Sequence, residues 1–138
     1  MDNDIIGVNV CAAFLPVNRR LMVVQRNEKG SDALKWELPG GKLEDGEDFE
    51  TAIKRECKEE LDLTVCVVEE VGSVEIDRGH DAIMFMFILV NGDFSKIKLK
   101  EHKDIKYVTY AELKKLDMCE ADKIFVNTYE AEIRRHID

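Results

Sequence analysis

The alternation of apolar and polar positions predicts strands in the first half of the chain and again near its middle. Two β-rich runs, residues 5–15 and 20–26, flank the turn residues PVNR, which predicts a β-hairpin. The polar, glycine-containing residues 27–35 are expected to form a loop. Strand composition returns at residues 64–77 and 82–91, and the second run is apolar enough for a central strand covered on both faces.

A different apolar spacing predicts a helix directly after the glycine pair of WELPGGK. Between residues 48 and 61, apolar side chains recur every four positions, which is typical of an amphipathic helix with one buried stripe. Asp48 or Asp45 is expected to cap its first turn. This helix also carries a dense group of glutamates, so its polar face needs an explanation of its own.

Two more helices are expected towards the end of the chain. Residues 105–117 read as a short strand and then a helix, in which Thr109 and Glu112 have the spacing of a capping box. A final helix is expected from about residue 121 to 135. Because strands and helices are mixed without regular βαβ alternation, we expect an α/β fold with a mixed β-sheet covered on both sides by helices.

Length and composition fit one globular unit, and we expect residues 1–138 to form a single domain. The longest apolar run, residues 82–90, is far shorter than the roughly 20 residues that cross a bilayer. The first residues also lack the basic segment of an export signal. We therefore expect a cytoplasmic protein without a membrane segment.

The cysteines and the histidines predict no zinc site. Cys11, Cys57, Cys66 and Cys119 lie within apolar stretches without a CxxC pair, so they are expected to be small buried side chains in a reducing compartment. The three histidines are scattered, and each is expected to be a polar surface residue: His80, His102 and His136.

The net charge of −9, without a basic block, argues against a nucleic-acid partner. If such a chain binds phosphate, a divalent cation is expected to mediate the contact.

The glutamates of the predicted helix 48–61 cluster on one side. With about 100° per residue, Glu60 lies about 40° from Glu56 in one direction and Glu59 about 60° in the other, beside the buried stripe. We expect them to be neither fully buried nor free in solvent. Such carboxylates repel one another unless a cation such as Mg²⁺ or Mn²⁺ joins them. Arg55 could pair with Glu47 and orient the cluster, or it could merely screen the negative charge. The alternative is an ordinary solvated Lys/Glu helix.

The spacing of residues 41–63 resembles the Nudix box, GX5EX7REUXEEXGU, in which U is an apolar residue. Six fixed positions match: Gly41, Glu47, Arg55, Glu56, Glu59 and Glu60. So many matches at fixed spacing make a specific signal. The departure is Asp62 in place of glycine after the helix. Because Asp tolerates the left-handed conformation, we expect strain of about 1 kcal/mol and an intact site.

The resemblance extends over most of the chain and implies a fold, a cofactor and roles for single residues. It is similar to the MutT-like nucleoside triphosphate pyrophosphohydrolases, which implies the Nudix fold, an α/β/α sandwich. The implied ligands of Mg²⁺, or Mn²⁺, are the carbonyl of Gly41 with Glu56, Glu59 and Glu60. Glu101 in EHKDIKYV would be a further ligand or the general base.

The resemblance also implies a small-molecule nucleotide substrate. Arg26 would contact phosphate, and Asp122 would read the edge of the base; the alternative for Asp122 is a simple helix N-cap. The expected reaction is hydrolysis of a nucleoside triphosphate, with an oxidised guanine, a cytosine or a 5-methylcytosine, to the monophosphate and pyrophosphate. The alternatives are a Nudix hydrolase for nucleotide sugars or dinucleoside polyphosphates, and a noncatalytic Nudix-like binding module.

Overall fold

Two β-sheets organise the part of the chain that the computed structural model describes, residues 7–138; Ile5 and Ile6 of the first predicted strand lie outside it. The strands are β1 (Val8–Phe14), β2 (Pro16–Val17), β3 (Arg20–Gln25), β4 (Trp36–Glu37), β5 (Gly40–Lys42), β6 (Val65–Asp77), β7 (Ala82–Gly92) and β8 (Asp104–Val108). A mixed sheet has the order β5-β1-β7-β6, in which β1 and β7 are parallel. In a second, antiparallel sheet, β3 pairs with β2, β4 and β8.

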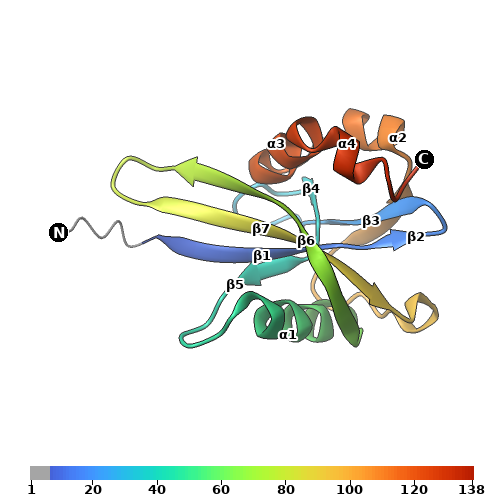
Figure 1. Cartoon of the computed structure of the whole chain (residues 1–138), viewed down its shortest axis with the longest axis horizontal. Helices are drawn as coiled ribbons and strands as arrows, with labels where there is room; N and C mark the ends of the chain where they lie inside the picture. Colours follow the sequence, from blue (N-terminus) through green and yellow to red (C-terminus); the bar gives the residue numbers. More distant parts are fainter. Residues whose placement is uncertain (1–6) are drawn as a thin grey trace.

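Helices cover both sides of these strands. They are α1 (Phe49–Leu61), the 3-10 turn η1 (Phe94–Lys96), α2 (Tyr110–Lys115), α3 (Glu120–Thr128) and α4 (Glu130–Ile133). Figure 1 shows α1 on one side of the strands and α2, α3 and α4 together on the other, while the β6-β7 hairpin extends past the helices. The layers form an α/β/α sandwich, which confirms the predicted fold class.

Alternating side chains of the inner strands supply two separate cores. On β1, Phe14 packs with the residues of α3, whereas Cys11 packs with those of α1. On β7, Phe87 stacks on Phe125 of α3 with ring centroids 3.9 Å apart, and its neighbour Ile88 faces the α1 side. Because successive side chains of a strand point to opposite faces, a run that is apolar at every position is needed where both faces are covered.

The first predicted hairpin is much shorter than expected. Its ladder joins β2 to the start of β3 around a turn in which Asn18 and Arg19 have φ of 50° and 61°. Positive φ at both central residues is the mark of the tight turns that suit a hairpin. After Leu15, however, the chain changes sheets: β1 pairs with β5 and β7, not with β3.

The prediction of one continuous helix over residues 121–135 is wrong, because the helix is interrupted at Tyr129, between α3 and α4. The Tyr129 hydroxyl accepts from the N–H of Ser73 at 3.1 Å and donates to its carbonyl at 3.0 Å. Its ring lies against Gly72, where an added Cβ would come within 2.5 Å of ring carbon. The break therefore lets Tyr129 fasten the C-terminal helices to β6.

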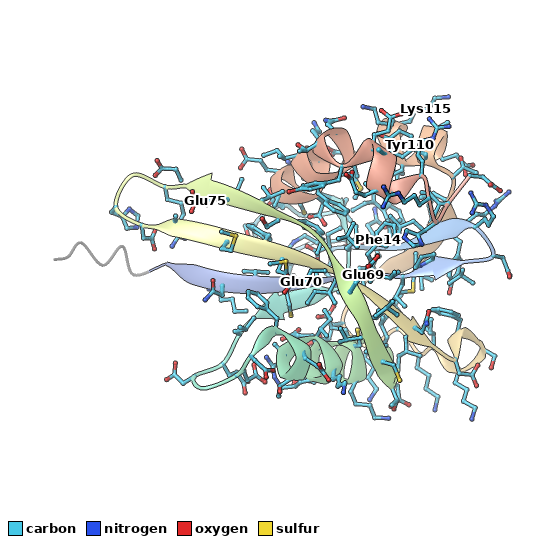
Figure 2. All side chains as sticks on the ribbon, in the orientation of Figure 1. Phe14, Glu69, Glu70, Glu75, Tyr110 and Lys115 are labelled. Carbon is cyan, nitrogen blue, oxygen red and sulfur yellow. The ribbon has the colours of Figure 1, made fainter. Side chains whose placement is uncertain are left out.

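Several local predictions are confirmed. Asp48 caps α1 by accepting from the N–H of Thr51 at 2.8 Å, and Thr109 forms a complete capping box. Cys66 is a correction, because it is exposed on β6 while the other three cysteines are buried. β6 forms an edge of the mixed sheet, and its exposed glutamates at positions 69, 70 and 75 line that edge (Figure 2), as charged residues do on natural sheet edges.

Candidate functional site

Helix α1 places its three clustered glutamates in different surroundings. The side chain of Glu56 is 13% exposed, that of Glu59 is 51% exposed, and Glu60 is 3% exposed. The expected partial burial of all three is therefore right for Glu56 alone. Glu60 is buried because a later segment of the chain crosses over it, whereas Glu59 points to the outer side of the helix towards Arg55.

Glu56 and Glu60 face a pocket of about 280 Å³. Its lining comes from the loop after β3, from β4, β5 and α1, and from the segment before β8: Arg26, Asn27, Lys29, Glu37, Gly40, Glu56, Glu60, Glu101 and His102. Carboxylates gather at the α1 end, and Arg26 and Lys29 supply positive charge from the loop after β3. The structure thus brings the predicted residues Arg26, Glu56, Glu60 and Glu101 together. It leaves four other predicted site residues outside the lining: Gly41, Arg55, Glu59 and Asp122.

Two backbone hydrogen bonds bring Glu101 to the pocket. The N–H groups of Lys98 and Lys100 donate to the carbonyls of Leu61 and Glu60, both at 2.9 Å. The last carbonyls of a helix have no partner within the helix, so the C-terminal end of α1 is a natural docking site for this segment. The segment then places Glu101 and His102 beside the carboxylate of Glu60.

The glycine pair lets the backbone approach the acidic end of α1. At Gly40, where φ is 158°, an added Cβ would lie 1.9 Å from the carbonyl oxygen of Cys11. At Gly41 it would lie 2.7 Å from Cδ and Oε2 of Glu56. Gly40 is therefore required for strand packing, and Gly41 makes the space that the Glu56 carboxylate fills. The Gly41 carbonyl accepts from the Cys11 thiol at 3.4 Å.

Arg55 orders the outer side of the cluster, and its predicted pairing with Glu47 is present. Nε and Nη2 bind the two oxygens of Glu47 at 2.7 and 2.9 Å. Nη1 donates to Glu56 at 2.8 Å and to Glu59 at 3.2 Å. The hydrogen bonds from Arg55, together with one from the N–H of Glu44, lower the pKa of Glu47 to about 2.

His102 and Glu37 are site residues that sequence reasoning missed. The predicted surface position of His102 is wrong, because its side chain is only 9% exposed and its Nε2 lies 2.9 Å from Glu37 Oε2. Glu37 also accepts from Nη1 of Arg26 at 3.1 Å. The charged residues on either side of His102 in the sequence suggest an exposed position. Its burial results from the docking of residues 98–100 on α1, which the local sequence does not show. The WELPGGK stretch contains Glu37, but nothing in the pattern points to its partners.

Asp122 and Glu37 belong to a second acidic group, in which Glu37 lines the pocket and Asp122 does not. A carboxylate oxygen of each, with the thiol sulfur of Cys119, falls within 4.8 Å of the others. Asp122 is buried and accepts from the N–H of Leu38 at 2.9 Å. It is not the N-cap of α3, a position that Cys119 occupies, so that alternative is wrong. Burial, and to a smaller extent the charge of Glu37, raise the pKa of Asp122 to about 8.

The α1 end of the pocket fits a divalent cation. Burial, and then the adjacent carboxylate of Glu56, hold the pKa of Glu60 far above its ordinary range. Glu60 Oε1 is buried without a hydrogen-bond partner among residues 7–138. A second carboxylate beside a buried one is unfavourable unless positive charge joins them, and oxygen ligands of this kind suit Mg²⁺ and Mn²⁺.

The NUDIX domain family model matches residues 6–129, so the chain belongs to the Nudix family. An 8-oxo-dGTP diphosphatase of Haemophilus influenzae is 36% identical over 93 residues, 66% of this chain and 66% of that protein. A CTP pyrophosphohydrolase of Escherichia coli is 35% identical over 66 residues, 48% of this chain and 49% of that protein. Within the family, the chain is a MutT-like pyrophosphohydrolase.

Solved structures carry the same fold. The solution structure of the E. coli ORF135 protein superposes with a TM-score of 0.81 at 25% identity, over 91% of this chain and 89% of that one. The crystal structure of a MutT protein from Methanosarcina mazei gives a TM-score of 0.80 at 20% identity, over 97% and 98%. None of the helices within residues 7–138 has the length and apolar character needed to cross a membrane.

Proposed function

We propose that this enzyme hydrolyses a nucleoside triphosphate, with an oxidised guanine, a cytosine or a 5-methylcytosine, to the monophosphate and pyrophosphate, and so removes unwanted nucleotides from the pool. The observation that carries the proposal is the pocket in which Glu56, Glu60 and Glu101 face Arg26 and Lys29. An acidic end suits a metal ion and a basic end suits a polyphosphate. The names of the H. influenzae and E. coli relatives support this substrate class.

Glu56 and Glu60 would hold Mg²⁺, or Mn²⁺, and Glu101 would be a further ligand or the general base. The Nudix box implies Glu59 and the Gly41 carbonyl as further ligands, and Glu59 would have to turn away from Arg55 to reach the ion. When bound, the ion supplies positive charge to the phosphate oxygens and lowers the pKa of a coordinated water. Glu101 is more exposed than Glu60, so it is the carboxylate better placed to take a proton from water.

The basic end of the pocket would orient the triphosphate. Arg26 donates through Nε to the carbonyl of Ser31 at 3.1 Å and through Nη1 to Glu37 at 3.1 Å, which fixes its guanidinium. Its Nη2 has no hydrogen-bond partner among residues 7–138, so it is available to a phosphate oxygen. Lys29 supplies a second positive charge at the same wall.

Asp122 remains the candidate for contact with the base. One of its oxygens is taken by Leu38, and its raised pKa keeps much of the carboxyl protonated near neutral pH. In that form it donates to a carbonyl, as in oxidised guanine; when ionised it accepts from the amino group of cytosine. The two states suit different bases, which is why a substrate panel is the decisive measurement.

The test is pyrophosphate release with Mg²⁺ from a panel of canonical, oxidised and methylated nucleoside triphosphates. We expect preferential cleavage of one modified guanine or cytosine nucleotide. Glu56→Gln and Glu60→Gln should each lower kcat at least about 100-fold, because a metal ligand contributes several kcal/mol to the transition state. Glu50→Gln, at an exposed position of the same helix, should keep full activity.

Stability separates lost chemistry from lost folding. Glu60→Gln removes a buried carboxyl next to Glu56, so without metal it should unfold at the same or a higher urea concentration than the wild type. An inactive but stably folded Glu60→Gln protein supports the proposal. Cleavage of nucleotide sugars or dinucleoside polyphosphates, with no pyrophosphate from any triphosphate, would overturn it.

A further inference from the structure

Glu60 and His102 lie next to each other in the pocket lining, and each has an unpaired polar atom that faces the other. Glu60 Oε1 and His102 Nδ1 are 3.7 Å apart, and neither has a hydrogen-bond partner among residues 7–138. Their side chains are more than nine-tenths buried, and 3.7 Å is too long for a hydrogen bond between them. Buried polar atoms in folded proteins are nearly always paired, so this pair indicates a ligand shared by both atoms.

The second ring nitrogen of His102 shows what kind of ligand Nδ1 can take. Nε2 lies 2.9 Å from Glu37 Oε2, and Arg26 holds the same carboxylate through Nη1. A carboxylate bound to an arginine acts as an acceptor, so Nε2 is the nitrogen that carries the hydrogen. In the neutral ring Nδ1 then presents a lone pair towards Glu60. Two facing lone pairs need a cation between them, which is either a shared proton or a metal ion.

The surroundings match a histidine that binds a metal ion. Histidine ligands commonly donate their other N–H to a carboxylate, which fixes the ring, and Glu37 supplies that carboxylate here. Two atoms that share an ion at about 2.1 Å each lie no more than about 4.2 Å apart, and the observed separation is within this limit. We propose that His102 Nδ1 and Glu60 Oε1 bind the same divalent cation.

This inference rests on the proposed metal site and adds to it a nitrogen ligand outside the Nudix box, with Glu37 as the residue that positions the ring. Oxygen-only sites suit Mg²⁺, whereas an imidazole shifts preference towards first-row transition metals. The site should therefore favour Mn²⁺ over Mg²⁺ more strongly with His102 than an all-carboxylate site would.

The experiment uses Mn²⁺ alone on the full chain, without substrate. Electron spin echo envelope modulation of bound Mn²⁺ detects a directly coordinated imidazole nitrogen, and we expect this signal in the wild type. His102→Gln keeps a donor for Glu37 but removes Nδ1, so the nitrogen signal should vanish. Mn²⁺ affinity should fall at least about tenfold and Mg²⁺ affinity less than about threefold. His80→Gln, at an exposed position, is the matched control and should keep the signal.

The outcomes separate this inference from the proposed function. If Mn²⁺ binds, Glu60→Gln weakens it, and the wild type shows no nitrogen signal, then His102 is not a ligand while the carboxylate site stands. A nitrogen signal that persists in His102→Gln would also overturn the assignment. If Mn²⁺ binding is unaffected by both Glu56→Gln and Glu60→Gln, the proposed metal site itself is wrong.

Discussion

The guanidinium of Arg55 grips the carboxylate of Glu47 with two hydrogen bonds, from Nε at 2.7 Å and from Nη2 at 2.9 Å. The remaining N–H groups reach Glu56, Glu59 and the carbonyl of Lys42, so all five donors of Arg55 have acceptors. This fork fixes the orientation of Glu56 next to the pocket.

Arg55→Lys should therefore cause a large loss of activity and only a small loss of stability. A lysine keeps the charge but cannot bind Glu47 through two parallel hydrogen bonds and reach Glu56 as well. We expect kcat to fall at least about tenfold and the free energy of unfolding to fall by about 1 to 2 kcal/mol. Steady-state kinetics and urea unfolding measure the two effects.

The matched control for Arg55→Lys is Lys54→Gln, which breaks the exposed pair of Lys54 with Glu50 on the same helix. Such a surface pair contributes about 0.5 kcal/mol or less, so activity and stability should hardly change. An Arg55→Lys protein as active as this control would show that the fork does not orient the site.

The two adjacent glycines should respond differently to alanine. In Gly41→Ala the new Cβ meets the carboxylate of Glu56, the flexible end of a side chain that can move aside. We expect a stability loss of about 1 kcal/mol or less, because the contact is relieved by a side-chain rotation. Since that rotation displaces Glu56 from the pocket, metal affinity and kcat should each fall at least about tenfold.

Gly40→Ala serves as the contrast, because its Cβ would meet the backbone carbonyl of Cys11 in the neighbouring strand. Backbone cannot rotate away, so we expect a loss of about 3 kcal/mol or more in the free energy of unfolding. Equal stability losses in the two alanine variants would contradict the separate roles of these glycines.

Asp122 should make stability depend on pH. Its pKa is raised from 3.8 to about 8 in the folded protein by burial. Between these two pH values the folded state retains a proton that the unfolded state releases. The contribution of Asp122 to the free energy of unfolding is therefore complete below about pH 4 and is lost as pH rises to about 8. The slope is at most about 1.4 kcal/mol per pH unit for one proton.

Asp122→Asn removes this titration while keeping an oxygen that accepts from the N–H of Leu38. Relative to the wild type, the variant should gain stability progressively between about pH 4 and 8 and no further above that range. Urea unfolding of both proteins across this range measures the difference. A difference that stays constant with pH would rule out the raised pKa as a source of instability.

Asp62 should be nearly exchangeable with the glycine usual at its position in the Nudix box. It has φ of 53° and ψ of 34°, and its N–H donates to the carbonyl of Lys58 at 3.1 Å. Glycine removes the left-handed strain but also the pairs with Lys58 at 3.2 Å and Lys100 at 3.9 Å, and it raises the entropy of the unfolded chain.

We expect Asp62→Gly to change the free energy of unfolding by about 1 kcal/mol or less and to leave kcat unaltered. Salt screens the ion pairs of Asp62 in the wild type. The free energy of unfolding of the variant should therefore rise relative to that of the wild type as the NaCl concentration rises. Asp62→Asn keeps the left-handed tolerance without the charge and separates the two effects. A loss above about 2 kcal/mol, or a salt-independent difference, would contradict this account.

Local signals in the sequence predicted most single elements of the fold. These signals act between residues that are close in the sequence, so the order of residues is sufficient to predict them. They are the helix caps at Asp48 and Thr109, the apolar period of α1 and the left-handed conformation of Asp62. The change of sheet after Leu15 and the break at Tyr129 depend on partners far along the chain, β7 in one case and β6 in the other. No local pattern encodes those partners.

The same division holds for the site. The sequence by itself determined the family spacing and the acidic face of α1, because these follow from residue types at fixed separations and from helix periodicity. It offered the pair of Arg55 with Glu47 as one of two alternatives, and the structure contains that pair. Only the tertiary structure decided that Glu60 is buried while Glu59 is exposed, and that His102 joins Glu37 in the pocket. The physical reason is the docking of residues 98–100 on the free carbonyls of α1, a contact between segments roughly forty residues apart.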